Sequence, residues 1–309
     1  MKEDECPNST EKVFHILAFA YSGTGLWFFF TGILVIYLLT FLGNMTIITL
    51  VSLVPHLQTP MYYFLANLAF TDVASVSSIL PKLLTILQTQ DNQMSLAACL
   101  TQIYIFSMTI TYGTLVLASM SYDRFVAICK PLQYYTLMRK EICISVSAFS
   151  LVICKINAAV NVIIVFTLSF CLTQNIDHFY CDPKTLYGIT SSNGETMTLV
   201  LVVQDQLFGS VTFLLVVTSY VFIILTISKI QSSKGRLKAF SSCGSHLTTV
   251  MLFYCPGIVL YTKPESKHSK EMDKLMSLIF MAVVPMLNPF VYTLRNKDIF
   301  KAVQHITRT

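Results

Sequence analysis

Residues 199–230 read LVLVVQDQLFGSVTFLLVVTSYVFIILTISKI. Asp205 is the one charged residue in this run before Lys229. A helix needs about 20 predominantly apolar residues to cross the hydrocarbon core of a bilayer. The run is long enough, and it therefore predicts a membrane-spanning helix.

Six other segments of the chain have the same character. With this one, the predicted spans lie at about 26–52, 60–87, 97–128, 142–168, 197–228, 239–262 and 272–294. Strands of a membrane barrel would instead alternate with period two over segments of about ten residues, and that pattern is absent from the sequence. We therefore predict an all-α membrane protein folded as a seven-transmembrane helix bundle.

The composition supports a lipid environment. The 309 residues are 54% hydrophobic and 12% charged, and this charged fraction is about half that of an ordinary soluble domain. No linker rich in Pro, Gly or Ser divides the chain. We predict an extracellular N-terminal segment (1–25), the seven-transmembrane bundle (26–294), and a cytoplasmic tail (295–309) with a short amphipathic eighth helix.

The basic residues predict the orientation of the bundle. Twelve of the 21 follow the third span, follow the fifth span or lie in the tail: Arg124, Lys130, Arg139, Lys140, Lys229, Lys234, Arg236, Lys238, Arg295, Lys297, Lys301 and Arg308. Cytoplasmic loops are enriched in Lys and Arg, so the N-terminus is predicted to lie outside. The net charge of +5 is divided among separate loops, which argues against a nucleic-acid partner.

The N-terminal segment carries a predicted glycosylation site. Residues 1–12 contain acids and no apolar stretch, so they do not form a cleavable signal peptide, and the first span is expected to direct insertion. Asn8-Ser9-Thr10 is an acceptor sequence on the side predicted to be outside. We therefore expect a glycan on Asn8.

Four cysteines lie on the predicted outer side, namely Cys6, Cys99, Cys171 and Cys181. Four cysteines allow three pairings, and the spacing alone does not choose among them. A bond between Cys99 and Cys181 would hold the second outer loop across the mouth of the bundle, leaving Cys171 either free or paired with Cys6. The other five lie in spans or at their cytosolic ends, where thiols stay reduced: Cys129, Cys143, Cys154, Cys243 and Cys255.

Ionisable residues inside predicted spans are candidate functional residues, because charges are costly in lipid. Asp72 has no basic neighbour in its span and needs water, a cation or a polar partner such as Asn44 or Asn288. Adjacent opposite charges at Asp123 and Arg124, where the third span meets the cytosol, suit a switch that exchanges partners.

Two further charges have more than one interpretation. Lys155, in the fourth span, either hydrogen-bonds Asn157, Asn161 or a carbonyl as a neutral amine or pairs with Asp205 of the fifth span. Asp205 is otherwise a solvated carboxylate in a pocket. With Gln204, it predicts a ligand that carries a polar or basic group.

Prolines interrupt the last two spans at Pro256, Pro285 and Pro289. Proline is tolerated in membrane helices where side chains or water satisfy the freed backbone groups. The Asn288-Pro289 step, with Tyr292 one turn later, predicts either a hinge or a static kink.

Four motifs resemble those of one receptor family. Residues 119–129 (SMSYDRFVAIC) resemble the MAYDRYVAIC signature of olfactory receptors and depart from it at Ser121 and Phe125. Residues 60–65 (PMYYFL), 238–247 (KAFSSCGSHL) and 285–292 (PMLNPFVY) resemble that family's PMYFFL, KAFSTCxSHL and PMLNPFIY. The motifs fall in order on the expected spans. The chain therefore resembles olfactory receptors, which are rhodopsin-like G-protein-coupled receptors of class A, over about residues 8–300.

The resemblance implies a multi-pass receptor of the plasma membrane that is not an enzyme and has no cofactor. It implies a small-molecule odorant as ligand and a stimulatory heterotrimeric G protein of the olfactory type, which raises cAMP. It also implies a disulfide between Cys99 and Cys181. The implied ligand-binding residues are Phe106, Ser107, Ile110, Thr111, Gln204, Asp205, Phe208, Tyr254, Ile258, Tyr261, Leu278 and Met281.

The resemblance further implies a set of residues for activation and G-protein coupling: Asp72, Asp123, Arg124, Tyr220, Asn288, Pro289 and Tyr292. Gly113 stands where many members carry a glutamate that faces the second-span aspartate, so the resemblance does not support a sodium site at Asp72, and no other metal is expected.

Two other classes of function fit the residues less well. A transporter or channel would be expected to show an internal repeat with paired broken helices, and the sequence has none. An enzyme needs a nucleophile with a base, or a cluster of metal ligands, and the spans contain neither. A receptor of olfactory type that senses a metabolite outside the nose remains an alternative, and the sequence does not distinguish it.

Overall fold

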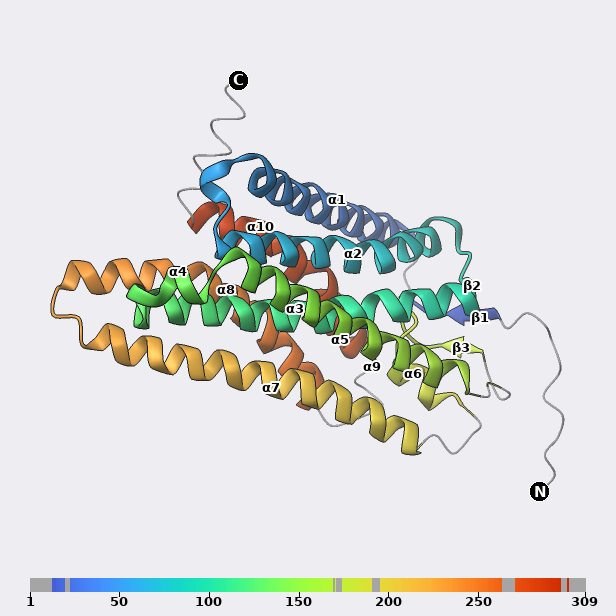
Figure 1. Ribbon diagram of the computed structural model, residues 1–309. Helices are drawn as coiled ribbons and strands as arrows, with labels where there is room; N and C mark the ends of the chain where they lie inside the picture. The colour runs from blue at the N-terminus through green and yellow to red at the C-terminus, as the bar shows by residue number, and fades with distance from the viewer. Residues whose placement is uncertain are drawn as a thin grey trace.

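The computed structural model describes residues 13–19, 23–168, 170, 174–190, 195–262, 270–295 and 299. Its long helices are α1 (Thr24–Leu53), α2 (Pro60–Thr89), α3 (Leu96–Cys129), α5 (Lys140–Phe166), α7 (Glu195–Ser228) and α8 (Ser233–Thr262). The last predicted span is built from α9 (Lys270–Leu278), the π-helical turn η3 (Ile279–Val283) and α10 (Val284–Arg295). These helices run side by side as one bundle (Figure 1).

The helices confirm the predicted fold class. Six helices among the described residues are long and apolar enough to cross a membrane. The apolar part of α8 is shorter and covers Cys243–Val259, because its first turns carry Lys234 and Arg236. The proposed eighth helix lies outside the described residues, apart from Ile299.

Short elements connect the spans. They are η1 (Pro55–Leu57), η2 (Pro131–Gln133), α4 (Tyr134–Leu137) and α6 (Pro183–Gly188). The α6 helix begins with a cap, since the Asp182 carboxylate accepts a hydrogen bond from the Thr185 backbone N–H. Figure 1 shows α4 at one end of the bundle and α6 near the other.

A small sheet at the α6 end was not predicted. It consists of β1 (Val13–Ile16), β2 (Gln93–Ser95) and β3 (Asn175–Ile176), in the order β2-β1-β3. The β1 strand runs antiparallel to β2 and parallel to β3. Phe14 and Ile16 point from β1 into the protein and are buried. The sheet thus joins the N-terminal segment to the loops that follow α2 and α5.

The bundle is assembled around α3, which packs against α2, α5 and α7. The buried apolar side chains of the whole bundle divide into two clusters. One includes Leu68, Leu117 and Ile223, and the other includes Leu80 and Ile103 with side chains of the sheet. Many large apolar side chains, such as Phe149, Ile163 and Leu214, remain exposed on the helices, as expected for contact with lipid.

The contact between α1 and α10 depends on Gly43. A Cβ atom at Gly43 would lie 3.0 Å from the Cβ atom of Pro289. One residue later, the Asn44 side-chain amide donates to the Pro285 carbonyl at 3.2 Å and to the Thr40 carbonyl at 2.9 Å. Asn44 therefore satisfies backbone groups at the interrupted span and is not the partner of Asp72.

Candidate functional site

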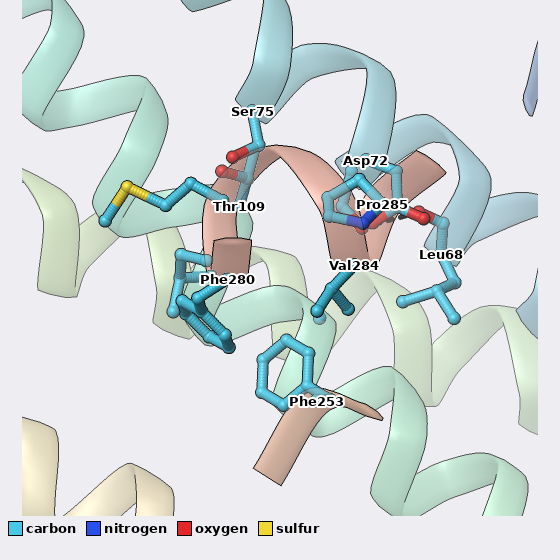
Figure 2. A pocket seen from close by; sticks show the side chains of 12 residues that line it. Leu68, Asp72, Ser75, Thr109, Phe253, Phe280, Val284 and Pro285 are labelled. Carbon is cyan, nitrogen blue, oxygen red and sulfur yellow. Dashed lines mark hydrogen bonds between the residues drawn. The ribbon is translucent and has the colours of Figure 1, made fainter. Parts of the chain in front are cut away.

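A cavity lies between α2, α3, α8 and the last span. Its lining residues are Leu68, Thr71, Asp72, Ser75, Thr109, Ile110, Gly113, Phe253, Phe280, Met281, Val284 and Pro285. Figure 2 shows Ser75 and Thr109 on one side of this space and Phe253 on the other. The cavity therefore has a polar wall and an aromatic wall.

Asp72 is held on the polar wall by a hydrogen bond across the bundle. The Asn288 amide donates to a carboxylate oxygen of Asp72 at 2.8 Å, and both side chains are buried. Of the two partners that the sequence suggested, the structure places Asn288 against Asp72. The bond joins α2 to α10 beside the cavity.

The cavity is small. Its volume is about 20 Å³, close to the minimum of roughly 10–15 Å³ that one water molecule needs. Sites for small organic ligands usually measure roughly 300–1,000 Å³. In this arrangement the cavity is therefore too small to hold an organic ligand of that size.

The predicted ligand-binding residues of α3 lie in different surroundings. Ile110 lines the cavity. Ser107 and Thr111 are buried, and they accept hydrogen bonds from the side-chain amides of Asn161 at 3.2 Å and Asn157 at 3.3 Å. The ring of Phe106 packs on Tyr180 of the second outer loop, with 5.3 Å between the centroids.

The predicted ligand-binding residues of α7, α8 and the last span are spread over a wider region than those of α3. Met281 lines the cavity. Leu278, on the same span and just before Met281 in the sequence, is also buried. Tyr254 is buried and donates to the Thr212 hydroxyl at 2.9 Å. Ile258 is 46% exposed. The side chains of Asp205 and Tyr261 lie outside the described residues, while Gln204 and Phe208 are partly buried on α7.

Sequence reasoning missed most of the polar wall. Thr71 and Ser75 lie on α2 within a turn of Asp72, and Thr109 lies on α3 one residue before Ile110. The helical spacing of three to four residues around Asp72 was the available signal for Ser75. The aromatic pair Phe253 and Phe280, with 5.3 Å between ring centroids, had no comparable signal.

Asp72 is the one carboxylate among the described lining residues. Gly113 lines the cavity without adding a polar group. No group of three His, Cys, Asp or Glu side chains gathers as a metal site within the described ranges.

At the other end of α3, Asp123 and Arg124 form an ion pair. The Arg124 Nε–H donates to an Asp123 carboxylate oxygen at 2.9 Å, and Arg124 Nη2 also contacts this oxygen. The Tyr134 hydroxyl of α4 donates to the other oxygen at 2.8 Å. Burial and the nearby Asp123 carboxylate raise the pKa of Tyr134, so this hydroxyl remains a donor. Asp123 thus joins Arg124 to the loop after α3.

Tyr220 and His246 form a second contact near that end. The Tyr220 hydroxyl lies 2.7 Å from His246 Nδ1, and their rings stack with 5.9 Å between centroids. Tyr292 is fully buried as well. His246 was not among the predicted residues, although it belongs to the quoted motif at residues 238–247.

The disulfide between Cys99 and Cys181 is present and fixes the second outer loop to the start of α3. Gln102 reinforces this attachment. Its side-chain oxygen accepts from the Cys181 backbone N–H at 2.8 Å, and its amide donates to the Ser78 carbonyl at 2.7 Å. Cys6, Cys171 and Asn8, for which the sequence suggested a bond or a glycan, lie outside the described residues.

Lys274 of α9 makes several polar contacts at the outer end of the bundle, and the sequence did not predict them. Its ammonium group lies 2.7 Å from an Asp177 carboxylate oxygen and 2.9 Å from a Glu271 carboxylate oxygen. It also donates to the Leu17 and Ala18 carbonyls at 3.2 and 3.0 Å. Lys274 therefore links the last span to both the N-terminal segment and the second outer loop.

Comparison with known proteins gives a consistent result. The sequence model of the family described as "Olfactory receptor" matches residues 33–308. The chain is 43% identical over 278 residues to "Olfactory receptor 1E16" of Mus musculus, covering 90% of this chain and 88% of that one. It shows the same identity and coverage with "Olfactory receptor 1" of Rattus norvegicus. With "Olfactory receptor 1N2" of Homo sapiens it is 41% identical over 267 residues, covering 86% of this chain and 84% of that one.

Proposed function

The chain belongs to the olfactory receptor family, and from this membership we propose that it binds a small odorant in the outer half of the bundle and activates a stimulatory G protein, which raises cAMP. As a member of this family it is a receptor and not an enzyme, and it is a multi-pass protein of the plasma membrane.

The proposed ligand site includes the wall of the Asp72 cavity at Ile110 and Met281, and it extends from there to Phe106, which packs on Tyr180 of the second outer loop. The buried hydroxyls of Ser107 and Thr111 and the partly buried Phe106 and Ile110 offer both polar and apolar contacts on α3. Phe208, Tyr254, Leu278 and Met281 are proposed to complete the site, together with Gln204, Asp205, Ile258 and Tyr261. Because the present cavity has room for about one water molecule, ligand binding must favour a wider arrangement.

Asp72 and Asn288 supply the proposed link from this site toward the G protein. Their hydrogen bond lies at the cavity wall and joins α2 to the Asn288-Pro289 step of α10. A ligand that separates these walls would change the bend at Pro289 and the position of Tyr292. A ligand shifts such an equilibrium by its difference in affinity for the two arrangements.

The loop after α3 is the proposed docking surface for the G protein. Leu132 is 98% exposed and Tyr135 is 87% exposed, close to the ion pair of Asp123 and Arg124. Exposed apolar side chains in a polar rim are typical of protein interaction sites. In the active arrangement, Arg124 is proposed to leave Asp123, and Tyr220 and Tyr292 are proposed to hold the opened mouth.

The observation that carries the proposal is the position of the Asp123–Arg124 pair at the end of the central helix, where Asp123 is buried, Arg124 is partly buried and Tyr134 ties Asp123 to the exposed loop. The ion pair is proposed as the element near the G protein whose two arrangements the ligand shifts.

The test is a panel of odorants applied to cells that report cAMP. We expect at least one odorant to raise cAMP in cells with the natural chain and none to do so with Arg124→Gln at equal surface delivery. Arg139→Gln, which removes an exposed basic residue at the same end of the bundle, is the matched control and should respond normally. A normal response of Arg124→Gln would contradict the proposal.

A further inference from the structure

The N-terminal segment and the second outer loop lie together at the outer end of the bundle. The β1 strand pairs with β2, which precedes α3, and with β3 in the loop after α5. Figure 1 shows the three strands gathered at this end. Phe14 and Ile16 of β1 are at most 1% exposed, so the strand is packed against the bundle. We refer to residues 13–19 and 175–181 together as the outer cap.

The outer cap shares a hydrophobic cluster with proposed ligand-binding residues. The cluster contains Phe179 of the cap together with Leu278 and Met281 of the last span, and Phe106 of α3 packs against it. Tyr180 of the cap also contacts Phe106, with 5.3 Å between ring centroids. The position of the cap therefore affects how accessible the proposed ligand site is.

Lys274 fastens the outer cap to the last span. Its side chain is 4% exposed, and its ammonium group lies 2.7 Å from the Asp177 carboxylate, whose side chain is 39% exposed. The same ammonium group donates to the carbonyls of Leu17 and Ala18 and contacts the Glu271 carboxylate. Among the described residues, three of these four acceptors lie on the outer cap. One buried cation thus holds both parts of the cap.

The contacts of Lys274 differ in what they connect. Glu271 lies on α9 itself, three residues before Lys274, so their contact joins one turn of the helix to the next. Asp177 lies on the cap, so its contact fixes the separation between the cap and the last span. Leu278 follows Lys274 by about one turn on the same face of α9. The wall that bears this proposed ligand-binding residue is therefore the one to which the cap is attached.

We propose that Lys274 is a positioning residue for ligand binding, which holds the outer cap closed over the ligand site through Asp177 and the two N-terminal carbonyls. Breaking a buried ion pair leaves a charge without compensation, so the closed cap is favoured while these contacts are intact. Release of the contacts opens the site to the outer solution. The inference rests on the proposed function, because the space beneath the cap is the proposed ligand site.

The test measures access to a thiol beneath the cap. Ser277 lies about one turn after Lys274 and is 4% exposed, and Ser277→Cys only exchanges its oxygen for sulfur. Cells that display the receptor are treated with a membrane-impermeant maleimide. The labelling rate is corrected for that of the same protein with serine at this position, because the chain has its own cysteines. We expect Lys274→Met to raise the labelling rate of the introduced thiol roughly tenfold at equal surface delivery.

Two further variants compare the carboxylates that contact Lys274. Asp177→Ala removes the partner on the cap and should also accelerate labelling, whereas Glu271→Ala removes the partner on α9 and should not. In the Lys274→Met background Asp177→Ala should add little, since the effects of residues joined by an ion pair are not additive. Asp177 is partly exposed, so Asp177→Ala provides the answer if Lys274→Met does not reach the cell surface.

The proposal is overturned if Asp177→Ala labels the introduced thiol no faster than its parent, or if Glu271→Ala accelerates labelling as much. Ser121→Cys, fully buried toward the inner end of α3, is the control for general loosening of the fold. It should stay unlabelled in every background, and its labelling in Lys274→Met or Asp177→Ala would also overturn the proposal.

The odorant response separates this inference from the proposed function. Each odorant that activates the natural chain should wash out faster from Asp177→Ala, and an unchanged rate of wash-out would contradict a closed cap over the ligand site. If no odorant activates the natural chain, the proposed function fails, while the labelling rates still decide whether Lys274 holds the cap.

Discussion

At the residue scale, one hydrogen bond inside the bundle connects the proposed ligand site to the last span. Asp72 accepts it from Asn288, and both groups are buried. A buried polar group that loses its partner costs roughly 1–3 kcal/mol. The bond is therefore a specific source of stability as well as a proposed route of transmission.

Removing this bond should destabilise the receptor. We expect Asn288→Ala to lower the free energy of unfolding by roughly 1–3 kcal/mol, because the Asp72 carboxyl group is left without this donor. Asp72→Ala should add little in the Asn288→Ala background, since residues joined by a hydrogen bond are not additive. Thermal unfolding of the purified variants gives both values. Fully additive losses would show that the bond is not formed.

His178 predicts a dependence of stability on pH. The imidazole is buried in the second outer loop, and burial, followed by the nearby Lys274, lowers its pKa from 6.5 while Asp182, Asp177 and Asp273 act in the opposite direction. The folded protein then binds fewer protons than the unfolded chain below that value. Stability is therefore complete above about pH 6.5 and decreases as the pH falls.

The measurement is the melting temperature of the purified receptor at about pH 7.5 and about pH 5.5, on either side of the ordinary histidine pKa. We expect a decrease at the lower pH that becomes smaller in His178→Asn. The same decrease in both proteins would assign the pH dependence to other groups.

At the element scale, the spans could be predicted because long apolar runs determine membrane helices. The predicted span at 60–87 became α2 (Pro60–Thr89), and the one at 97–128 became α3 (Leu96–Cys129). The outer sheet could not be predicted. Its strands have two to four residues, and their pairing joins segments that are far apart in the sequence, such as His15 with Asn175.

The contact between α1 and α10 gives a prediction with an internal control. A methyl group on Gly43 would approach Pro289 Cβ to 3.0 Å and Cγ to 3.1 Å, so the two helices would have to separate. We expect Gly43→Ala to lower stability by roughly 1–3 kcal/mol, the usual cost of overpacking.

Gly32 lies on the same helix, and a Cβ atom there meets nothing within 4 Å. Gly32→Ala should leave stability unchanged or slightly raise it, because Ala favours a helix more than Gly does. Thermal unfolding of both variants provides the comparison. Equal effects of the two substitutions would refute a close contact at Gly43.

At the scale of the whole molecule, part of the candidate site was visible in the sequence and part was not. Asp72, Asp123 and Arg124 could be identified because charges in apolar spans are conspicuous. The choice of Asn288 over Asn44 as the partner of Asp72 depends on how α1, α2 and α10 pack. In the sequence, nothing distinguishes a cavity-lining apolar residue such as Phe253 from the apolar residues that pack between helices.

The same limit applies to the ligand-binding residues. Helical spacing predicted one shared face on α3, and Ser107, Ile110 and Thr111 do lie toward the interior. Ile258 is 46% exposed, and the orientation of α8 that causes this cannot be obtained from a motif. The set as a whole remains a proposal.

An odorant in the outer half of the bundle is proposed to open the opposite end to a G protein. Nucleotide exchange tests it most directly, with the purified receptor in lipid discs, a purified stimulatory G protein and an odorant whose binding has been measured on the same sample. We predict that the odorant accelerates exchange severalfold with the natural chain and not with Arg124→Gln. An odorant that binds and leaves the exchange rate of the natural chain unchanged would contradict the account.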